Sequence, residues 1–136
     1  MELKQLAKRK LLEFHRWRMI ANLFHEPTES FDNWLIPSLE FDPEDYKLRK
    51  YGWQREAPNE VNEILRAINA IAKPRQRAIL IMSYISPDKI QSVEQAQRLG
   101  IASSTYYLAK NKALEEFASL YRDGVLKKYR NTHSIV

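Results

Sequence analysis

The sequence predicts an all-α protein with an N-terminal helix, an irregular acidic connector and a C-terminal bundle that contains a helix-turn-helix. Apolar residues recur at spacings of three and four along most of the chain, which is the period of an amphipathic helix. Prolines fall where one helical pattern gives way to the next. Near the C-terminus, a serine-led helix start, a glycine turn and a second helical pattern follow one another, as a helix-turn-helix requires.

The composition is that of one globular domain, or of one small domain with an accessory helix. The chain has 136 residues, of which 44% are hydrophobic and 29% are charged. Lys and Arg outnumber Asp and Glu by 22 to 17, and the resulting net charge of +5 permits a polyanionic partner. The absence of cysteine excludes disulfides, thiolate metal sites and cysteine nucleophiles. With only three glycines, the chain has no glycine-rich phosphate loop.

Residues 2–24 form the first predicted helix. Its main apolar face carries Leu3, Leu6, Ala7, Phe14, Trp17, Ala21 and Phe24. A second, narrower stripe on the opposite side carries Leu12, Met19 and Leu23. A helix that is apolar on two sides typically lies between two partners. The second stripe therefore packs within the same domain or forms a subunit interface, and a homodimer through 2–24 is a candidate assembly.

Residues 26–57 form the predicted connector. Its first part, 26–46, carries seven acidic residues and no basic one, and prolines interrupt any helical pattern. Its aromatic residues are too apolar to remain in water, so we expect it to pack on the helices. The acidic group around Asp42 lacks the glycine turn of a calcium loop and indicates a solvated surface. The sequence thus divides into a helix, a connector, a helix-turn-helix domain and a basic tail, at 1–25, 26–57, 58–124 and 125–136.

Two further helices are predicted before the glycine turn. Pro58 suits the first turn of a helix that runs to Ala72 with one clean apolar stripe. Pro74 ends that helix and suits the first turn of the next. Residues 75–86 are apolar nearly all round, which is typical of a central helix buried by its neighbours.

The predicted helix-turn-helix lies between residues 92 and 121. Ser92 to Gln95 has the pattern of a capping box, and the short helix that it begins places Ile90, Val93, Ala96 and Leu99 inward. Gly100 then allows a sharp turn at positive φ. A longer helix follows from the Ala102–Thr105 region to about Tyr121 and stops at Gly124. Its inner face should be held by Ile101, Tyr106, Ala113, Leu114 and Phe117.

The outer face of the second helix carries side chains that suit DNA. Hydroxyls bind phosphates or base edges, Asn pairs with adenine, Lys reaches guanine or phosphate, and Leu contacts a thymine methyl. The candidate DNA-reading residues are Ser103, Ser104, Thr105, Tyr107, Leu108, Asn111 and Lys112. Because residues 92–124 carry no net charge, phosphate contacts must also come from the flanks. The candidates for those contacts are Lys73, Arg75, Arg77, Lys89, Ser92 and Lys110.

Residues 98–118 resemble the C-terminal signature of the ArpU family of phage-encoded transcriptional regulators from Gram-positive bacteria. The resemblance extends more loosely over 58–121, and it rests on the Leu-Gly-Ile turn at 99–101, the Ser-Thr-Tyr-Tyr start at 104–107, Lys-Ala-Leu at 112–114 and Phe-Ala at 117–118. It implies a fold similar to sigma-factor region 4, direct binding to promoter DNA and activation of late phage genes. The family usually has Arg-Leu where this chain has Leu108 and Ala109, so its operator sequence does not carry over.

The sequence argues against some other function classes and leaves two alternatives to a DNA-binding regulator. The spacing of His15, His25 and His133 does not suit a metal site, and no catalytic signature occurs, so we expect no enzyme activity, metal or cofactor. No signal peptide or membrane segment is recognisable, and a cytoplasmic protein of the bacterial host is expected. Two alternatives to a DNA-binding regulator remain: a sigma-like module that binds host RNA polymerase or another protein, and a DNA-packaging adaptor resembling a phage small terminase.

Overall fold

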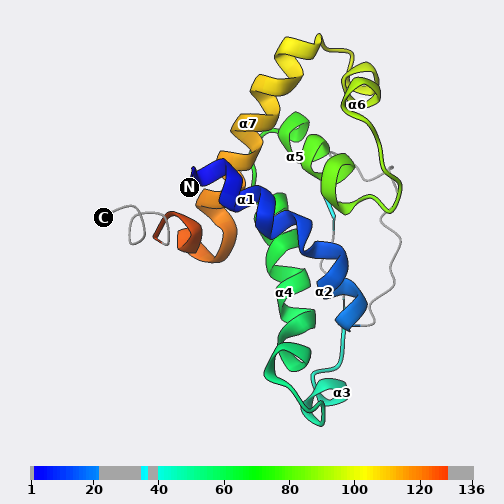
Figure 1. Cartoon of the computed structure of the whole chain (residues 1–136), viewed down its shortest axis with the longest axis vertical. Coiled ribbons are helices and arrows are strands. Elements are labelled where there is room, and N and C mark those ends of the chain that lie inside the picture. Colours follow the sequence, from blue (N-terminus) through cyan, green and yellow to red (C-terminus); the bar gives the residue numbers. More distant parts are fainter. Residues whose placement is uncertain (1, 22–34, 37–39, 129–136) are drawn as a thin grey trace.

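The computed structural model describes residues 2–21, 35–36 and 40–128, and every regular element in these ranges is a helix. The predicted all-α class is therefore confirmed (Figure 1). The helices are α1 (Leu3–Leu12), α2 (Phe14–Ala21), α3 (Glu44–Lys47), α4 (Gly52–Asn69), α5 (Pro74–Leu80), the π-helix η2 (Ile81–Ile85), α6 (Ser92–Leu99), α7 (Ser103–Leu120) and the 3₁₀-helix η3 (Tyr121–Gly124).

The predicted N-terminal helix is present as two helices that meet at Glu13. Its carboxylate accepts hydrogen bonds from the indole of Trp17, at 3.0 Å, and from Lys10, at 3.3 Å. The main apolar face is buried as predicted at Leu3, Leu6, Ala7, Phe14 and Ala21, and Trp17 is half-buried. On the second stripe, Leu12 and Met19 are 62% and 68% exposed. Leu23 and Phe24 lie outside the described residues.

Helix α4 begins at Gly52, so the prediction that Pro58 occupies the first turn of a helix is wrong. A proline inside a helix removes one backbone hydrogen bond and costs about 3 kcal/mol. Local and tertiary contacts offset that cost. The Tyr51 amide donates to the Gln54 side chain at 3.2 Å, which caps the earlier turn, and Ala57 and Pro58 are themselves buried.

The described part of the connector packs on the helices only in part, because Tyr46 is buried whereas Leu35 and Trp53, which were also expected to pack, are 44% and 50% exposed. Tyr46 of α3 is buried, and its hydroxyl donates to the Ala21 carbonyl at 2.6 Å. Arg49 binds the Ile20 carbonyl at 2.6 Å, so α3 is fastened to the end of α2. Pro27, Trp34 and Pro37, together with the rest of 22–34 and 37–39, lie outside the described residues.

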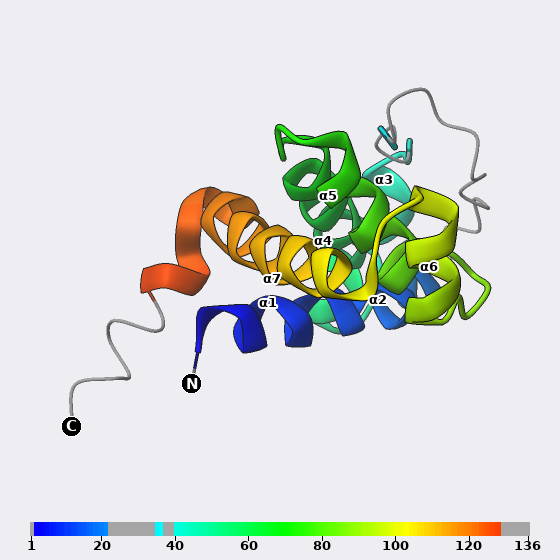
Figure 2. The same ribbon diagram turned by 90° about the horizontal axis from the view of Figure 1, so that it is seen from above.

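The centre of the molecule is α5 with η2. Pro74 begins α5, and residues 78–82, 84 and 85 are buried, so the prediction of a buried central helix is confirmed. One hydrophobic cluster joins residues of α1, α4, η2 and α7. Helix α1 lies alongside α7 (Figures 1 and 2). Helix α6 and the start of α7 lie at the end of the molecule opposite α3 (Figure 1). The division into four segments stays a prediction.

Candidate nucleic-acid interface

Helices α6 and α7 are joined by the predicted sharp turn. Gly100 ends α6 in the left-handed region, with φ of +67°. A Cβ atom at this position would meet nothing within 4 Å, so the demand for glycine comes from the backbone angle and not from crowding. After the turn, α7 runs from Ser103 to Leu120, close to its predicted bounds. Residues 125–128 are helical again, and the rest of the predicted tail lies outside the described residues.

The capping box predicted at Ser92–Gln95 is absent. The cap residue of α6 is Gln91, and it makes no side-chain hydrogen bond. Gln95 is instead buried, with an exposed fraction of 2%. Its amide donates to the Ile90 carbonyl at 2.9 Å, and its oxygen accepts from the hydroxyls of Tyr106 and Ser83 at 2.8 and 3.2 Å. Gln95 is therefore the interior link between α6, α7 and η2.

Most of the predicted inward residues are where the pattern placed them, with one exception. Tyr106, Ala113, Leu114 and Phe117 are buried along α7, and Ile101 is half-buried. Ile90, before α6, and Ala96 of α6 are buried and Leu99 is partly buried, but Val93 is 65% exposed. Val93 was predicted to point inward and does not. Gln95, two residues further along and on another side of the helix, occupies the interior instead.

The outer face of the first half of α7 is exposed, although Tyr106 anchors this half of the helix to α5 and α6. All seven candidate DNA-reading residues are exposed: Ser103, Ser104, Thr105, Tyr107, Leu108, Asn111 and Lys112. The anchors in the second half of α7 pack into the main cluster. The inner face of α7 is thus held in both halves of the helix, while the outer face of the first half presents hydroxyl, amide and ammonium groups to solvent.

The six candidate phosphate contacts separate into three groups. Lys73, Arg75 and Lys89 are exposed, whereas Ser92 and Lys110 are half-buried. Arg77 is buried, and its guanidinium donates to the carbonyls of Ile71 and Ala72. The prediction of a phosphate contact at Arg77 is therefore corrected: its guanidinium is held by the carbonyls of the link between α4 and α5.

Lys110 lies in a basic environment that the sequence did not reveal. Its ammonium is 5.7 Å from the centre of the Tyr84 ring and 5.9 Å from that of Tyr106. Burial, followed by the charge of Lys8, holds the pKa of Lys110 below its ordinary value. Lys8 lies on α1, about a hundred residues away in sequence, and no spacing pattern relates it to α7. Sequence reasoning missed Lys8, Tyr84 and the interior role of Gln95 for this reason.

Other kinds of site have little support in the described part of the chain. Over those residues, no helix combines the length and apolar character needed to cross a membrane. No group of three or more metal-binding side chains comes together there. His15 is half-buried, and burial, followed by the charge of Arg18, lowers its pKa. His25 and His133 lie outside the described residues.

Comparison with known proteins gives two matches. Residues 52–118, from the start of α4 to the last turn of α7, match a family described as a protein of unknown function, DUF1492. The chain is 28% identical over 124 residues to a protein of Streptococcus phage O1205 named "Putative autolysin regulatory protein ArpU", which covers 88% of this chain and 87% of the relative. No solved structure gives a significant match. The two matches together support a relationship between this chain and the ArpU-like proteins.

Proposed function

We propose that this protein is a sequence-specific regulator of transcription that binds double-stranded DNA, with α6 and α7 acting as a helix-turn-helix. The observation that carries the proposal is the exposed outer face of the first half of α7, on which seven residues suited to DNA are exposed together. An α-helix fits the major groove of B-form DNA, where each base pair displays a distinct pattern of donors and acceptors. In this arrangement α7 reads the bases and α6 lies across the backbone.

The roles of the side chains follow from their places on α7. Ser103, Ser104 and Thr105 form the first turn and bind backbone phosphates or base edges. Asn111 and Lys112 lie two turns further along and contact adenine and guanine. The exposed Lys73, Arg75 and Lys89 add phosphate contacts, which set register and affinity without reading sequence.

The regulatory assignment draws support from the relative, whose name describes a regulatory protein and not an enzyme. The resemblance to the ArpU family adds the sign of regulation and the setting: activation of late phage genes in the cytoplasm of the bacterial host. Binding with the help of host RNA polymerase is part of the proposal, because the short net-neutral α6–α7 unit supplies little phosphate affinity alone.

A genome-wide binding map at fixed salt, followed by footprinting of the strongest site, tests the proposal. We expect one or a few sites upstream of phage genes, and Asn111→Ala should weaken binding there about tenfold by removing an adenine contact. Asn59→Ala is the matched control because Asn59 is exposed on α4, away from α7. Co-purification with polymerase and no footprint would support the protein-interaction alternative, and a large ring in solution would support the packaging adaptor.

We further propose that the regulator is a homodimer through the second stripe of the N-terminal helices. Leu12 and Met19 are highly exposed apolar residues on the outer side of α1 and α2. Met19→Glu should convert the dimer to the 16.1 kDa monomer in light scattering, because a carboxylate would be desolvated at the interface. Leu48→Glu, at an apolar residue that is 97% exposed beside α3, should leave the mass unchanged. An unchanged mass for Met19→Glu would contradict this interface.

A further inference from the structure

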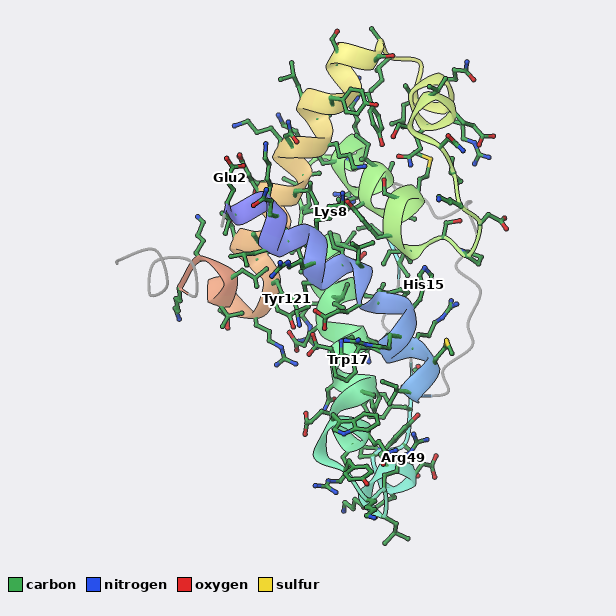
Figure 3. All side chains as sticks on the ribbon, in the orientation of Figure 1. Glu2, Lys8, His15, Trp17, Arg49 and Tyr121 are labelled. Carbon is green, nitrogen blue, oxygen red and sulfur yellow. The ribbon has the colours of Figure 1, made fainter. Side chains whose placement is uncertain are left out.

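A groove of about 300 Å³ lies where α6 begins, and its walls come from segments far apart in the sequence. Lys8 from α1, Lys89 from the link before α6, and Lys110 from α7 line it together (Figure 3 marks Lys8). No carboxylate is among the described residues that line the groove. Three lysines therefore line the groove without an acidic residue in the lining, which favours an anion.

The second feature is a buried hydroxyl without a partner on a residue that lines the groove. Tyr84 of η2 lines the groove with an exposed fraction of 6%, and its hydroxyl has no hydrogen-bond partner in the described structure. Buried hydroxyls are rarely left in this state. Burial, followed by the electrostatic interaction with Tyr106, raises the pKa of Tyr84 to about 12. The hydroxyl therefore keeps its proton and can donate a hydrogen bond.

The start of α6 adds donors at the same place. Ser92 is the first residue of this eight-residue helix and lines the groove with its neighbour Gln91. Because Gln91 makes no side-chain cap, the amides of the first turn have no capping acceptor. Amides at a helix N-terminus, ammonium groups and a protonated phenol are all donors to an oxyanion.

We propose that this groove binds a phosphate group through Lys8, Tyr84, Lys89, Ser92 and Lys110. The identification of that group as a backbone phosphate of DNA rests on the function proposed above. The groove adjoins α6 and α7, so a duplex read by α7 would bring its backbone to this place. Lys8 then gives the N-terminal helix a direct part in DNA binding, although it lies outside the 52–118 family match.

The first test uses inorganic phosphate, titrated at constant ionic strength against chloride and followed by NMR of the full chain. We expect saturable shifts of the amides of residues 91–95. Tyr84→Phe should weaken phosphate binding about tenfold, since it removes one charge-assisted hydrogen bond. Lys8→Ala should weaken it severalfold, and Lys50→Ala, the same change beside α3, should have no effect. Wild-type protein without a saturable response would overturn the site.

The stability of Tyr84→Phe separates a binding role from a structural one. Because the hydroxyl has no partner in the described structure, its removal should leave the thermal midpoint of the phosphate-free protein unchanged or raise it. A lowered midpoint would contradict the assignment, since it would mean that the hydroxyl already has a stabilising contact inside the protein.

The second test asks whether the phosphate belongs to DNA. Lys8→Ala should weaken binding to specific and nonspecific duplexes alike and reduce the salt slope of log K by about 0.9. An unchanged slope, with phosphate binding intact, would overturn the DNA assignment and leave a site for a free phosphate compound. If the wild-type protein bound no DNA, the proposed regulator function would fail, whereas the phosphate titration would still decide whether the groove is an anion site.

Discussion

Replacing Gln95 by alanine should lower the free energy of unfolding by about 3 kcal/mol. Gln95 is buried and binds the Ile90 carbonyl and the hydroxyls of Tyr106 and Ser83. Alanine leaves a buried carbonyl and a buried phenol without partners, and it opens a cavity between α6 and α7. Urea denaturation of the full chain measures the change.

Gln97→Ala is the matched control for this prediction, because Gln97 is exposed on the same helix. It should change stability by less than about 0.5 kcal/mol. Tyr106→Phe should cost about 1 kcal/mol alone and much less in the Gln95→Ala background, since the hydrogen bond that it removes is already lost. A loss of unfolding free energy below about 1 kcal/mol for Gln95→Ala would mean that the hydrogen bonds of Gln95 contribute little and that apolar packing alone holds α6 in place.

Local signals were sufficient to predict most of the helices. The spacing of apolar residues located α7 and the buried α5–η2 segment closely, because each of these faces has the period of its own helix. Gly100 was predicted correctly because a left-handed backbone at the end of a helix strongly favours glycine. The same period also predicted the exposed face of α7, because it placed Tyr106, Leu114 and Phe117 on the buried face.

Contacts between distant segments account for what the sequence did not reveal. Ser92 and Gln95 match a capping box by local pattern, yet the hydroxyl of Tyr106 offers Gln95 a buried partner. Arg77 appeared to be one of several surface cations, but it is buried and donates to carbonyls of the link between α4 and α5. Pro58 is tolerated inside α4, where it and Ala57 are themselves buried. Each outcome depends on tertiary packing, which no local spacing encodes.

A second interior polar cluster fastens the end of α7 to α4 and α1. Glu60 of α4 is buried; it accepts a hydrogen bond from the Tyr121 hydroxyl and pairs with Arg122 at 2.8 Å and Lys10 at 3.5 Å (Figure 3 marks Tyr121). Arg122 and Asp123 both adopt positive φ, so the chain turns sharply here at a cost in backbone energy. The pairing with Glu60 holds that turn in place.

The ionisation of Glu60 should make this cluster sensitive to acid. Burial alone would raise the pKa of Glu60, but the hydrogen bonds from Tyr121 and Arg122 and the charges of Lys10 and Arg122 outweigh burial and lower it. A carboxyl whose pKa is lower in the folded state stabilises the protein above its unfolded-state pKa. That contribution is lost as the pH falls through the folded-state pKa.

Glu60→Gln should therefore cost about 2–3 kcal/mol at neutral pH, because two cations and a phenol lose the carboxylate that they share. The difference in unfolding free energy between wild type and variant should narrow steadily below about pH 5, as Glu60 of the wild type takes up its proton. Glu63→Gln, one turn along α4 in a pair with the exposed Arg66, should cost less than about 0.5 kcal/mol and show no such narrowing. A gap for Glu60→Gln that stayed constant from pH 7 into acid would contradict the charged role of Glu60, since only loss of the carboxylate charge makes the cost depend on pH.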